Sequence, residues 1–304
     1  MNSRIVPLRG LLHLLVPLCL LACSLVAAAQ PVTITDDRGR TVKLAKPPTR
    51  IVSLLPSLTE TVCALQACNR LVGVDRYSTW PADKLARLPR VGGGLDPQIE
   101  SIVALRPDLV LVSEASRATD RLSALGIPVV ALQTRNHAEV RRTLDKVAIV
   151  LGLPQAQATA QWQRIQDGIA RAAQTVPAAA RGATVFVEVS RGPFAAGESS
   201  FIGETLTHLG LKNVVPAALG PFPKLNPEFV LRANPDLLMS SSRAQRGWLT
   251  YPGWSQLKAV RSNRICAFNV AESDLLIHPG PRMDEAAALM ARCVAQRLPK
   301  GAGR

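Results

Sequence analysis

Short apolar runs alternate with segments of helical periodicity through the first half of the chain. The runs read as buried strands because each spans only four or five residues and is bounded by turn-forming residues. Strand and helix alternation of this kind predicts an α/β protein with a mostly parallel sheet covered on both faces. The strand-like runs are 51–55, 71–74, 108–112 and 129–132, and the helical segments are 57–66, opened by a capping box from Ser57 to Glu60, 98–105 and 117–125, all after a polar entry segment at 33–46.

This alternation stops at residues 137–151, where one helical pattern is followed directly by another at 155–174. The second helix follows Pro154 and would be about 30 Å long at 1.5 Å per residue, which suits a rigid strut between two lobes. Strand and helix alternation resumes at 184–189 and ends with a helix at 282–297. We therefore predict two Rossmann-like lobes, joined by a single long helix, with a ligand cleft between them. The predicted units are an N-terminal lobe at 31–151, an interlobe helix at 152–176 and a C-terminal lobe at 177–304.

The two halves share an internal repeat. Glu100 stands eight residues before Asp108 in the first half, and Glu228 stands eight residues before Asp236 in the second. Each aspartate follows a proline and precedes an apolar run. The repeat predicts one supersecondary unit used twice, in which a helix with an acidic start ends before Pro-Asp and a buried strand follows. Chance recurrence of this pattern in an α/β protein is the alternative.

The first 29 residues have the order of a secretory signal peptide. Arg4 and Arg9 precede an apolar run at 11–26, and Ala27-Ala28-Ala29 supplies small residues for cleavage. A retained anchor helix and a lipid attached at Cys23 are the alternatives, and all three place the protein outside the cytoplasm, in the periplasm. We favour the cleaved form.

Four cysteines follow the predicted cleavage site, an even number that favours disulfides in an oxidising compartment. Three pairings are possible. The local pairs Cys63 with Cys68 and Cys266 with Cys293 are our prediction, with four buried free thiols as the alternative.

The formal charge is +14, and loss of Arg4 and Arg9 lowers it to +12. Nucleic acid is not the expected partner, because the basic residues are scattered and no aromatic recognition motif accompanies them. The three histidines after the leader lie far apart in sequence, so we expect neither a metal site nor a hydrolase triad. His278 stands in a Pro/Gly-rich segment, 274–282, which we expect to be a stiff loop presenting polar groups to the cleft.

Seven of the twelve aromatic residues fall in predicted loops, where a flat or bulky ligand could use them. For Trp248 and Trp254, loop packing is the favoured interpretation. The seven are Tyr77, Trp80, Phe194, Phe222, Trp248, Tyr251 and Trp254.

The segments 50–60, 71–81, 100–109 and 274–282, in this order, resemble the cobalamin-binding proteins of ABC importers. Their wider relatives bind siderophores and haem and have a helical backbone between the lobes. The resemblance covers nearly the whole chain after the leader. It implies a monomer that binds cobalamin as a transported ligand, has no cofactor of its own and does no chemistry on the ligand.

The resemblance also implies roles for single residues. Tyr77 would stack on the corrin ring, Phe194 and Phe222 would face the cleft, and Glu100 and Glu228 would dock on arginines of a permease dimer. His278 departs from the arginine usual in the family, and Gly94 stands where some members have tryptophan. A haem- or siderophore-binding protein is therefore the alternative, and an exported enzyme is the alternative of another class. The full set of predicted ligand contacts is Tyr77, Trp80, Phe194, Phe222, Asp274, Leu275, Leu276, Ile277 and His278.

Overall fold

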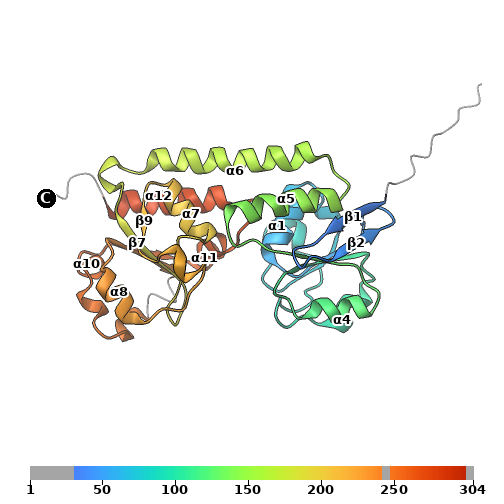
Figure 1. The fold of residues 1–304 in the computed structure, drawn as a ribbon, viewed down its shortest axis with the longest axis horizontal. Helices are drawn as coiled ribbons and strands as arrows, with labels where there is room; N and C mark the ends of the chain where they lie inside the picture. Colours follow the sequence, from blue (N-terminus) through green and yellow to red (C-terminus); the bar gives the residue numbers. More distant parts are fainter. Residues whose placement is uncertain (1–30, 242–246, 299–304) are drawn as a thin grey trace, which may run out of the picture.

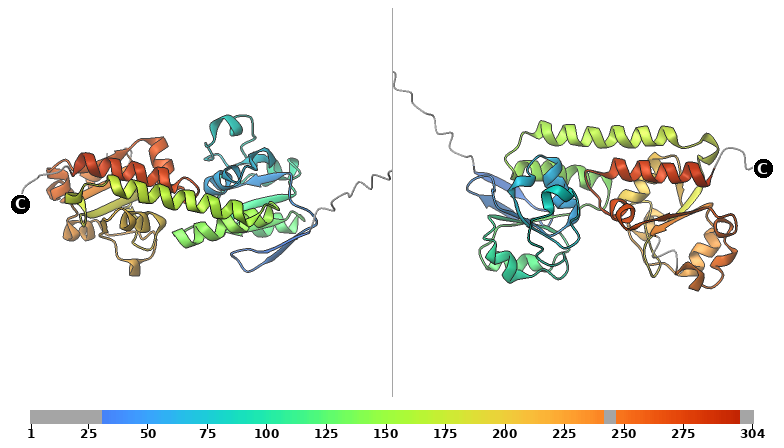
Figure 2. Two further views of the ribbon diagram at one scale, coloured as in Figure 1. Left: turned by 90° about the horizontal axis from the view of Figure 1, so that it is seen from above. Right: turned by 180° about the vertical axis from the view of Figure 1, so that it is seen from behind.

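The computed structural model describes residues 31–241 and 247–298. Two α/β lobes lie side by side, and one long helix runs across both of them (Figure 1). Two further views show the same arrangement from above and from behind (Figure 2). The leader predicted for residues 1–29, including Cys23, lies outside the described residues.

The N-terminal lobe is built on a parallel four-stranded sheet with the order β4-β3-β5-β6. A separate antiparallel hairpin, β1 with β2, precedes it. The strands are β1 (Val32–Thr35), β2 (Thr41–Leu44), β3 (Ile51–Ser53), β4 (Leu71–Val74), β5 (Leu109–Ser113) and β6 (Val129–Leu132). The helices are α1 (Pro56–Ala64), α2 (Ala82–Leu85), α3 (Ile99–Ala104), α4 (Ala118–Ala124) and α5 (His137–Val150), with a 3₁₀ turn at Cys68–Arg70.

The C-terminal lobe repeats this plan on a five-stranded sheet with the order β11-β10-β7-β8, in which β9 also pairs with β7. Only β8 runs antiparallel to its neighbour. The strands are β7 (Thr184–Ser190), β8 (Phe194–Ala195), β9 (Lys212–Asn213), β10 (Leu237–Ser241) and β11 (Ile265–Phe268). The helices are α7 (Phe201–His208), α8 (Pro227–Ala233), α10 (Lys258–Arg261), α11 (Val270–Ile277) and α12 (Met283–Arg297), with short 3₁₀ turns between several of them.

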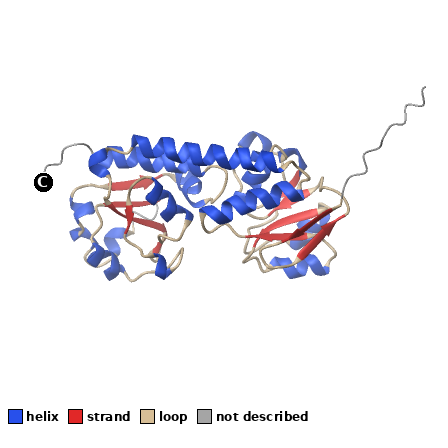
Figure 3. Cartoon of the chain, turned by 45° about the horizontal axis from the view of Figure 1, so that its top comes forward, coloured by secondary structure: helices blue, strands red, loops and turns tan. Residues whose placement is uncertain are grey.

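Helices cover both faces of each sheet, as the alternating strand pattern predicts (Figure 3). In the N-terminal lobe, α3 and α4 bury Ile102 and Leu122 against one face, and α1 and α5 bury Val62 and Leu144 against the other. In the C-terminal lobe, α8 and the turn holding Trp254 cover one face, while α7, α11 and α12 cover the other. One apolar core runs from α1 and α5 through the long helix to α12. The two lobes therefore share a buried core along the side that faces this helix.

The internal repeat has a structural basis. Asp108 Oδ2 accepts hydrogen bonds from the backbone N of Thr49 at 2.8 Å and from its hydroxyl at 3.0 Å. Asp236 Oδ2 accepts the same pair from Thr184, at 2.8 and 2.7 Å. Each aspartate precedes the strand that lies between two parallel neighbours, β5 in one lobe and β10 in the other. The Pro-Asp unit thus fastens a central strand to its neighbour in both lobes.

The helix between the lobes is α6 (Gln155–Thr175). Near its start, Gln157 donates to the backbone carbonyl of Leu65 in the N-terminal lobe at 2.9 Å. Farther along, α6 packs against α12 of the C-terminal lobe, and Gly168 allows the close approach, because a Cβ there would lie 2.4 Å from Cβ of Asp284. Arg164 pairs with the same aspartate at 2.7 Å. The strut is therefore a pair of packed helices over part of its length.

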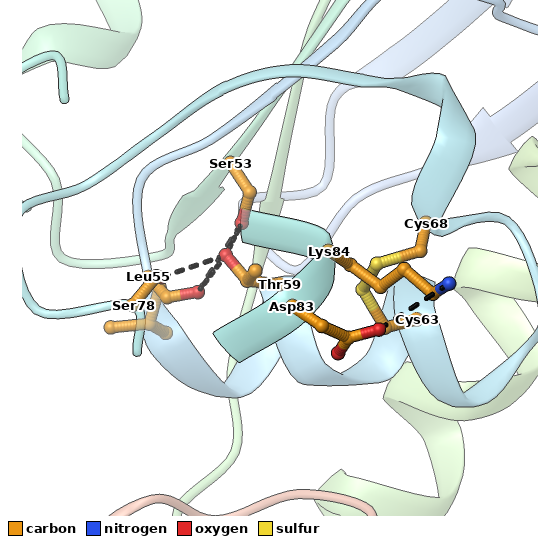
Figure 4. The surroundings of a disulfide bond; sticks show 8 residues. All are labelled: Ser53, Leu55, Thr59, Cys63, Cys68, Ser78, Asp83 and Lys84. Carbon is orange, nitrogen blue, oxygen red and sulfur yellow. Dashed lines mark hydrogen bonds and ion pairs between the residues drawn. A yellow bond between two sulfur atoms is a disulfide. The ribbon is translucent and has the colours of Figure 1, made fainter. Parts of the chain in front are cut away.

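Both local disulfides are present, which confirms the predicted pairing. Cys63 bonds to Cys68, and this bridge ties the end of α1 to the following 3₁₀ turn (Figure 4). Cys266 bonds to Cys293 and ties β11 to α12. The second bridge therefore fastens the C-terminal sheet to the helix that packs on the strut.

Three local predictions are wrong. The segment at 33–46 contributes the hairpin β1–β2, because Val32, Ile34 and Leu44 point into the core. The capping box at Ser57 is not formed: α1 begins at Pro56, whose fixed φ suits the first turn, and Leu55 is the cap without a side-chain hydrogen bond.

The third wrong prediction concerns the segment 274–282, expected to be a loop. Its first four residues are the last turn of α11. That helix begins with a capping box formed by Asn269 and Glu272, which the sequence analysis did not recognise. Only 278–282 forms the link to α12.

Candidate functional site

Three adjoining cavities form a trough at the carboxyl ends of the parallel strands, where α/β sheets usually bind ligands. The central cavity, about 280 Å³, lies between the lobes and is lined from both of them. A second cavity of about 290 Å³ lies in the N-terminal lobe, and Leu55 and Pro56 belong to the walls of both. A third, about 200 Å³, lies in the C-terminal lobe and shares Ile277 with the central one. A ligand can therefore reach from one lobe to the other along continuous walls.

Most of the predicted ligand contacts line this trough. Tyr77 faces the N-terminal cavity and is 58% exposed, and the guanidinium carbon of Arg76 lies 5.8 Å from its ring centre. The exposed part of the ring is accessible to a ligand. Phe222 lines the central cavity and rests on Phe201, with the two ring centres 5.9 Å apart. From α11 and its end, the trough receives Asp274, Leu276, Ile277 and His278.

Three other predicted contacts do not line these cavities. Trp80 is half-buried beneath Arg282, whose guanidinium carbon lies 4.9 Å from the ring centre. Phe194 stands on the edge strand β8 with the Lys224 ammonium 5.9 Å from its ring centre. Leu275 packs against the apolar core.

Gly94 also faces the trough, on the wall of the N-terminal cavity, where its ideal Cβ would lie 2.9 Å from the carbonyl oxygen of Leu54. The aromatic cluster of the C-terminal lobe is core: Trp248 and Trp254 are 2% and 0% exposed. This agrees with the favoured interpretation of both tryptophans as packing residues.

Acidic side chains dominate the charged positions of the trough. They are Asp75, Asp96, Glu114, Glu188 and Asp274, against one arginine, Arg135, and the imidazole of His278. The arginine is held by Glu139 of α5 at 2.9 Å, and among the acids Asp96 is paired with Arg76. On a chain with formal charge +14, the binding surface is therefore locally acidic.

The two most deeply buried of these acids have shifted pKa values. Burial raises the pKa of Glu188, although Trp248, Tyr251 and Ser240 donate hydrogen bonds to its carboxylate and oppose the shift. Burial likewise raises the pKa of Asp75, against hydrogen bonds from the Ser78 hydroxyl and the Tyr77 backbone. The hydrogen bonds to each acid hold a wall of the trough in place. Those to Asp75 shape the turn that presents Tyr77.

Sequence reasoning missed part of the wall. Glu114, Gln133 and Arg135 follow strands β5 and β6 and meet at the central cavity. Their place directly after two predicted strands was the available signal, because parallel strands end at the same edge of a sheet. Glu60 was also missed. It lies inside α1 and comes within 3.4 Å of His278 from the other lobe.

The two glutamates of the repeat lie outside the trough. Glu100 is in the first turn of α3 and pairs with Arg121 of α4 at 3.1 Å, and both side chains are largely exposed. Glu228 is exposed in the first turn of α8, where the Asn226 side chain accepts from its backbone N at 3.0 Å. In the described part of the chain, Glu228 forms no ion pair.

Within residues 31–241 and 247–298, no cluster of three histidine, cysteine, aspartate or glutamate side chains could hold a metal ion. No helix in the same ranges is long and apolar enough to cross a bilayer.

These features define a two-lobed binding protein with a trough between its lobes. The profile of the periplasmic binding protein family matches residues 51–269, and the chain belongs to that family. It is therefore a solute-binding protein of the kind that serves ABC importers.

Two named relatives are each 28% identical to this chain over the aligned residues. An uncharacterized ABC transporter substrate-binding lipoprotein, YvrC of Bacillus subtilis, is 28% identical over 87% of this chain and 85% of its own length. The vitamin B12-binding protein of Vibrio cholerae is 28% identical over 79% of this chain and 87% of its own.

Solved structures agree on the fold. The periplasmic vitamin B12-binding protein BtuF of Vibrio cholerae superimposes with a TM-score of 0.65 at 26% identity, covering 84% of this chain and 99% of that one. The periplasmic heme-binding protein RhuT of Roseiflexus sp. RS-1 gives a TM-score of 0.70 at 26% identity, with 82% and 98% covered. Similarity in fold therefore does not separate a corrinoid from haem.

Proposed function

We propose that this protein binds cobalamin in the trough between its lobes and delivers it to the permease of an ABC importer. The observation that carries the proposal is the acidic character of the trough. Glu114 and Asp274 face the cavities, Asp75 and Glu188 are buried in their walls, and Arg135 is already paired with Glu139. The relatives named as vitamin B12-binding proteins support the same ligand.

Charge separates the candidate ligands. The rim of cobalamin carries neutral carboxamides, whose N–H groups can donate to carboxylates, whereas haem carries two carboxylates and ferric catecholate siderophores are anions. Placing like charges together in a partly desolvated site costs several kcal/mol. The trough therefore favours a neutral, amide-rich ligand, and the exposed ring of Tyr77 offers a face on which a flat macrocycle can stack.

Calorimetric titration of the purified protein with cyanocobalamin, haemin and a ferric catecholate siderophore tests the ligand. We expect cyanocobalamin to bind with a Kd of about 1 μM or lower, and the two anions to bind at least about 100-fold more weakly. Absence of cyanocobalamin binding at micromolar concentration would contradict the proposal, and tighter binding of haemin would replace it with the haem alternative.

A charge reversal inside the trough sharpens this test. Asp274→Lys should weaken cyanocobalamin and strengthen haemin binding. The matched control is Glu228→Lys, which makes the same change on an exposed helix outside the cavities and should leave both affinities unchanged. An equal effect of both variants would show that total charge, rather than the trough, selects the ligand.

We further propose that the chain acts in the periplasm after cleavage of residues 1–29. The order of basic, apolar and small residues in the leader supports cleavage, whereas the lipoprotein YvrC is a relative with the other arrangement. The intact mass of the protein recovered after export distinguishes the two, because a lipid on Cys23 adds acyl chains to a chain that starts at that residue.

A further inference from the structure

The link between α11 and α12, residues 278–282, belongs to the C-terminal lobe but touches the N-terminal one. Gly280 lies against Ser57 of α1, where a Cβ on the glycine would be 3.4 Å from the Ser57 carbonyl oxygen. At the start of the link, His278 Nδ1 is 3.4 Å from Glu60 Oε1. At its end, Arg282 covers the indole of Trp80. This short segment is therefore a contact between the lobes at the base of the trough.

Glu60 is an acid inside a helix, with a side chain only 5% exposed. Its contact with His278 is longer than the usual range of about 2.7–3.2 Å. Its other oxygen, Oε2, is buried and has no hydrogen-bond partner among the described residues, and the same is true of the Ser57 hydroxyl. A buried carboxylate oxygen without a donor is unfavourable, so closer approach of His278, or a positive charge on it, would stabilise this contact.

The other charged groups around the contact are fixed in place. On the N-terminal side, Asp75 is buried, and Arg90 donates to the backbone carbonyls of Asp75 and Ser78. On the C-terminal side, Arg282 pairs with Glu285 of α12 at 2.8 Å. Asp284 of the same helix pairs with Arg164 of α6.

The buried carboxylate of Glu60 thus lies near one permanent cation of the other lobe, Arg282, and near one ionisable ring, His278, which also attracts Asp75. An imidazole ordinarily changes charge between about pH 5 and 8. A proton on His278 would therefore change the attraction between the lobes, while the neighbouring arginines stay charged throughout.

We propose that Glu60 is a positioning residue for the trough that acts through His278: protonation of the imidazole draws the link and the end of α11 toward the N-terminal lobe and narrows the trough. The same turn of α11 carries Ile277, which lines two of the cavities, and His278 itself lines the central one. Movement of the link therefore moves a wall of the binding site. Only the ligand measurement below rests on the proposed function.

The distance between the lobes tests this without any ligand. Spin labels on Ser123→Cys in α4 and Arg232→Cys in α8 report on the ends of the lobes away from α6 (Figure 1). The four cysteines in the described part of the chain are held in disulfides and would not be labelled. We expect the mean separation to be shorter at about pH 5.5 than at about pH 8, by about 2 Å.

Substitutions test whether the contact between His278 and Glu60 causes this pH-dependent change in the separation of the lobes. His278→Asn should keep the longer separation at both pH values, and His278→Arg, which stays charged, should keep the shorter one. Glu60→Gln should remove the pH dependence while the thermal unfolding curve confirms a folded protein. His208→Asn, the same substitution at an exposed histidine of α7, is the matched control and should retain the full shift.

An equal separation at both pH values in the unsubstituted protein would overturn the proposal, and so would an undiminished shift in His278→Asn. In a second measurement, we expect cyanocobalamin to dissociate about threefold more slowly at pH 5.5 than at pH 8, and this difference to vanish in His278→Asn. If cyanocobalamin does not bind at all, the ligand is wrong, but the separation measured without ligand still decides the role of Glu60.

Discussion

The guanidinium carbon of Arg282, in the C-terminal lobe, lies 4.9 Å from the centre of the indole ring of Trp80, in the N-terminal lobe. Cation and aromatic face attract each other at this distance, more strongly where water is excluded. Only 18% of the Arg282 side chain is exposed, and Glu285 holds its other side. Trp80 therefore joins the lobes rather than presenting an open face to a ligand.

Replacing this arginine should loosen the contact. We expect Arg282→Ala to lower the free energy of unfolding by about 1 kcal/mol and to shift tryptophan emission to longer wavelength, because Trp80 gains contact with water. Urea unfolding and fluorescence measure both effects. Arg292→Ala, at an exposed position of α12, the helix that follows Arg282, is the control. Unchanged emission in Arg282→Ala would show that the stacking contributes nothing in solution.

Tyr77 should contribute to ligand affinity through its ring. Tyr77→Ala is expected to weaken cyanocobalamin binding about tenfold, since the stacking contact of about 1 kcal/mol is lost together with the apolar area that the ring buries. Tyr77→Phe keeps the ring and should keep the affinity. Trp80→Ala should weaken binding less than Tyr77→Ala. A larger loss of affinity in Trp80→Ala, measured by calorimetry, would mean that the ligand contacts Trp80 rather than Tyr77.

The two glutamates of the repeat should differ in docking. Glu100 shares its charge with Arg121, whereas Glu228 has no ion pair in the described part of the chain. We expect Glu228→Lys to reduce importer-dependent uptake of cobalamin more strongly than Glu100→Lys, and the double variant to abolish it. Arg121→Ala should strengthen docking at Glu100.

Calorimetry supplies the control for docking, because none of these variants should change ligand affinity. Uptake that survives the double reversal would mean that the repeat has an architectural role alone. Uptake that is lost together with ligand binding would instead indicate damage to the fold.

The disulfides should differ in their contribution to stability. The Cys266–Cys293 bridge spans 27 positions and the Cys63–Cys68 bridge spans five. Restricting the unfolded chain over these loops stabilises the folded state by about 3.5 and about 2 kcal/mol, respectively. Urea unfolding of the two double-serine variants should rank them in this order. The reverse order would mean that the Cys63–Cys68 bridge stabilises the protein mainly by holding contacts at the end of α1, and that restriction of the unfolded chain is the smaller contribution.

The stabilisation contributed by the Pro-Asp unit of the C-terminal lobe, in which Asp236 accepts hydrogen bonds from Thr184, should depend on pH. Burial alone would raise the pKa of Asp236, but Lys258 at 2.9 Å and the donors of Thr184 together lower it below its ordinary value of 3.8. A carboxyl whose pKa is lowered by folding stabilises the folded state fully when the pH is above its pKa in the unfolded chain. This stabilisation is lost as the pH falls through its pKa in the folded protein.

We therefore expect Asp236→Asn to destabilise the protein by about 2 kcal/mol at pH 7 and by progressively less below about pH 4. Thermal unfolding at a series of pH values measures the difference. Asp108→Asn removes the carboxylate that accepts the same pair of threonine hydrogen bonds in the other lobe and is the matched comparison. A penalty for Asp236→Asn that does not change with pH would exclude the charge on Asp236 as its cause.

The architecture could be predicted well because the local pattern of apolar and polar residues indicates which segments form buried strands and which form helices. Strands such as 71–74 and 129–132 are continuous apolar runs, and the structure places them at these bounds. The hairpin at Val32–Leu44 was missed because its inward residues are separated by polar ones over only four positions per strand. Packing against α5, rather than local propensity, holds that hairpin in place.

The site was harder to predict, because its walls come from elements far apart in sequence. Tyr77 and Phe222 could be placed from the aromatics in predicted loops, and both line the trough. Nothing near Trp80 in the sequence indicates that Arg282 covers it. Nothing near Glu60 indicates that His278 meets it across the lobes. Such pairs depend on how one lobe sits on the other.

The Pro-Asp unit also places Glu100 and Glu228 at equivalent positions relative to the sheets of their own lobes. Glu100 and Glu228 are eight residues from Asp108 and Asp236, and each aspartate is bonded in the same way to a threonine. With both lobes built to one pattern, the distance between the two carboxylates is left to α6. Its 21 residues span about 30 Å. The length of this helix therefore limits how far apart a partner protein that contacts both glutamates can find them.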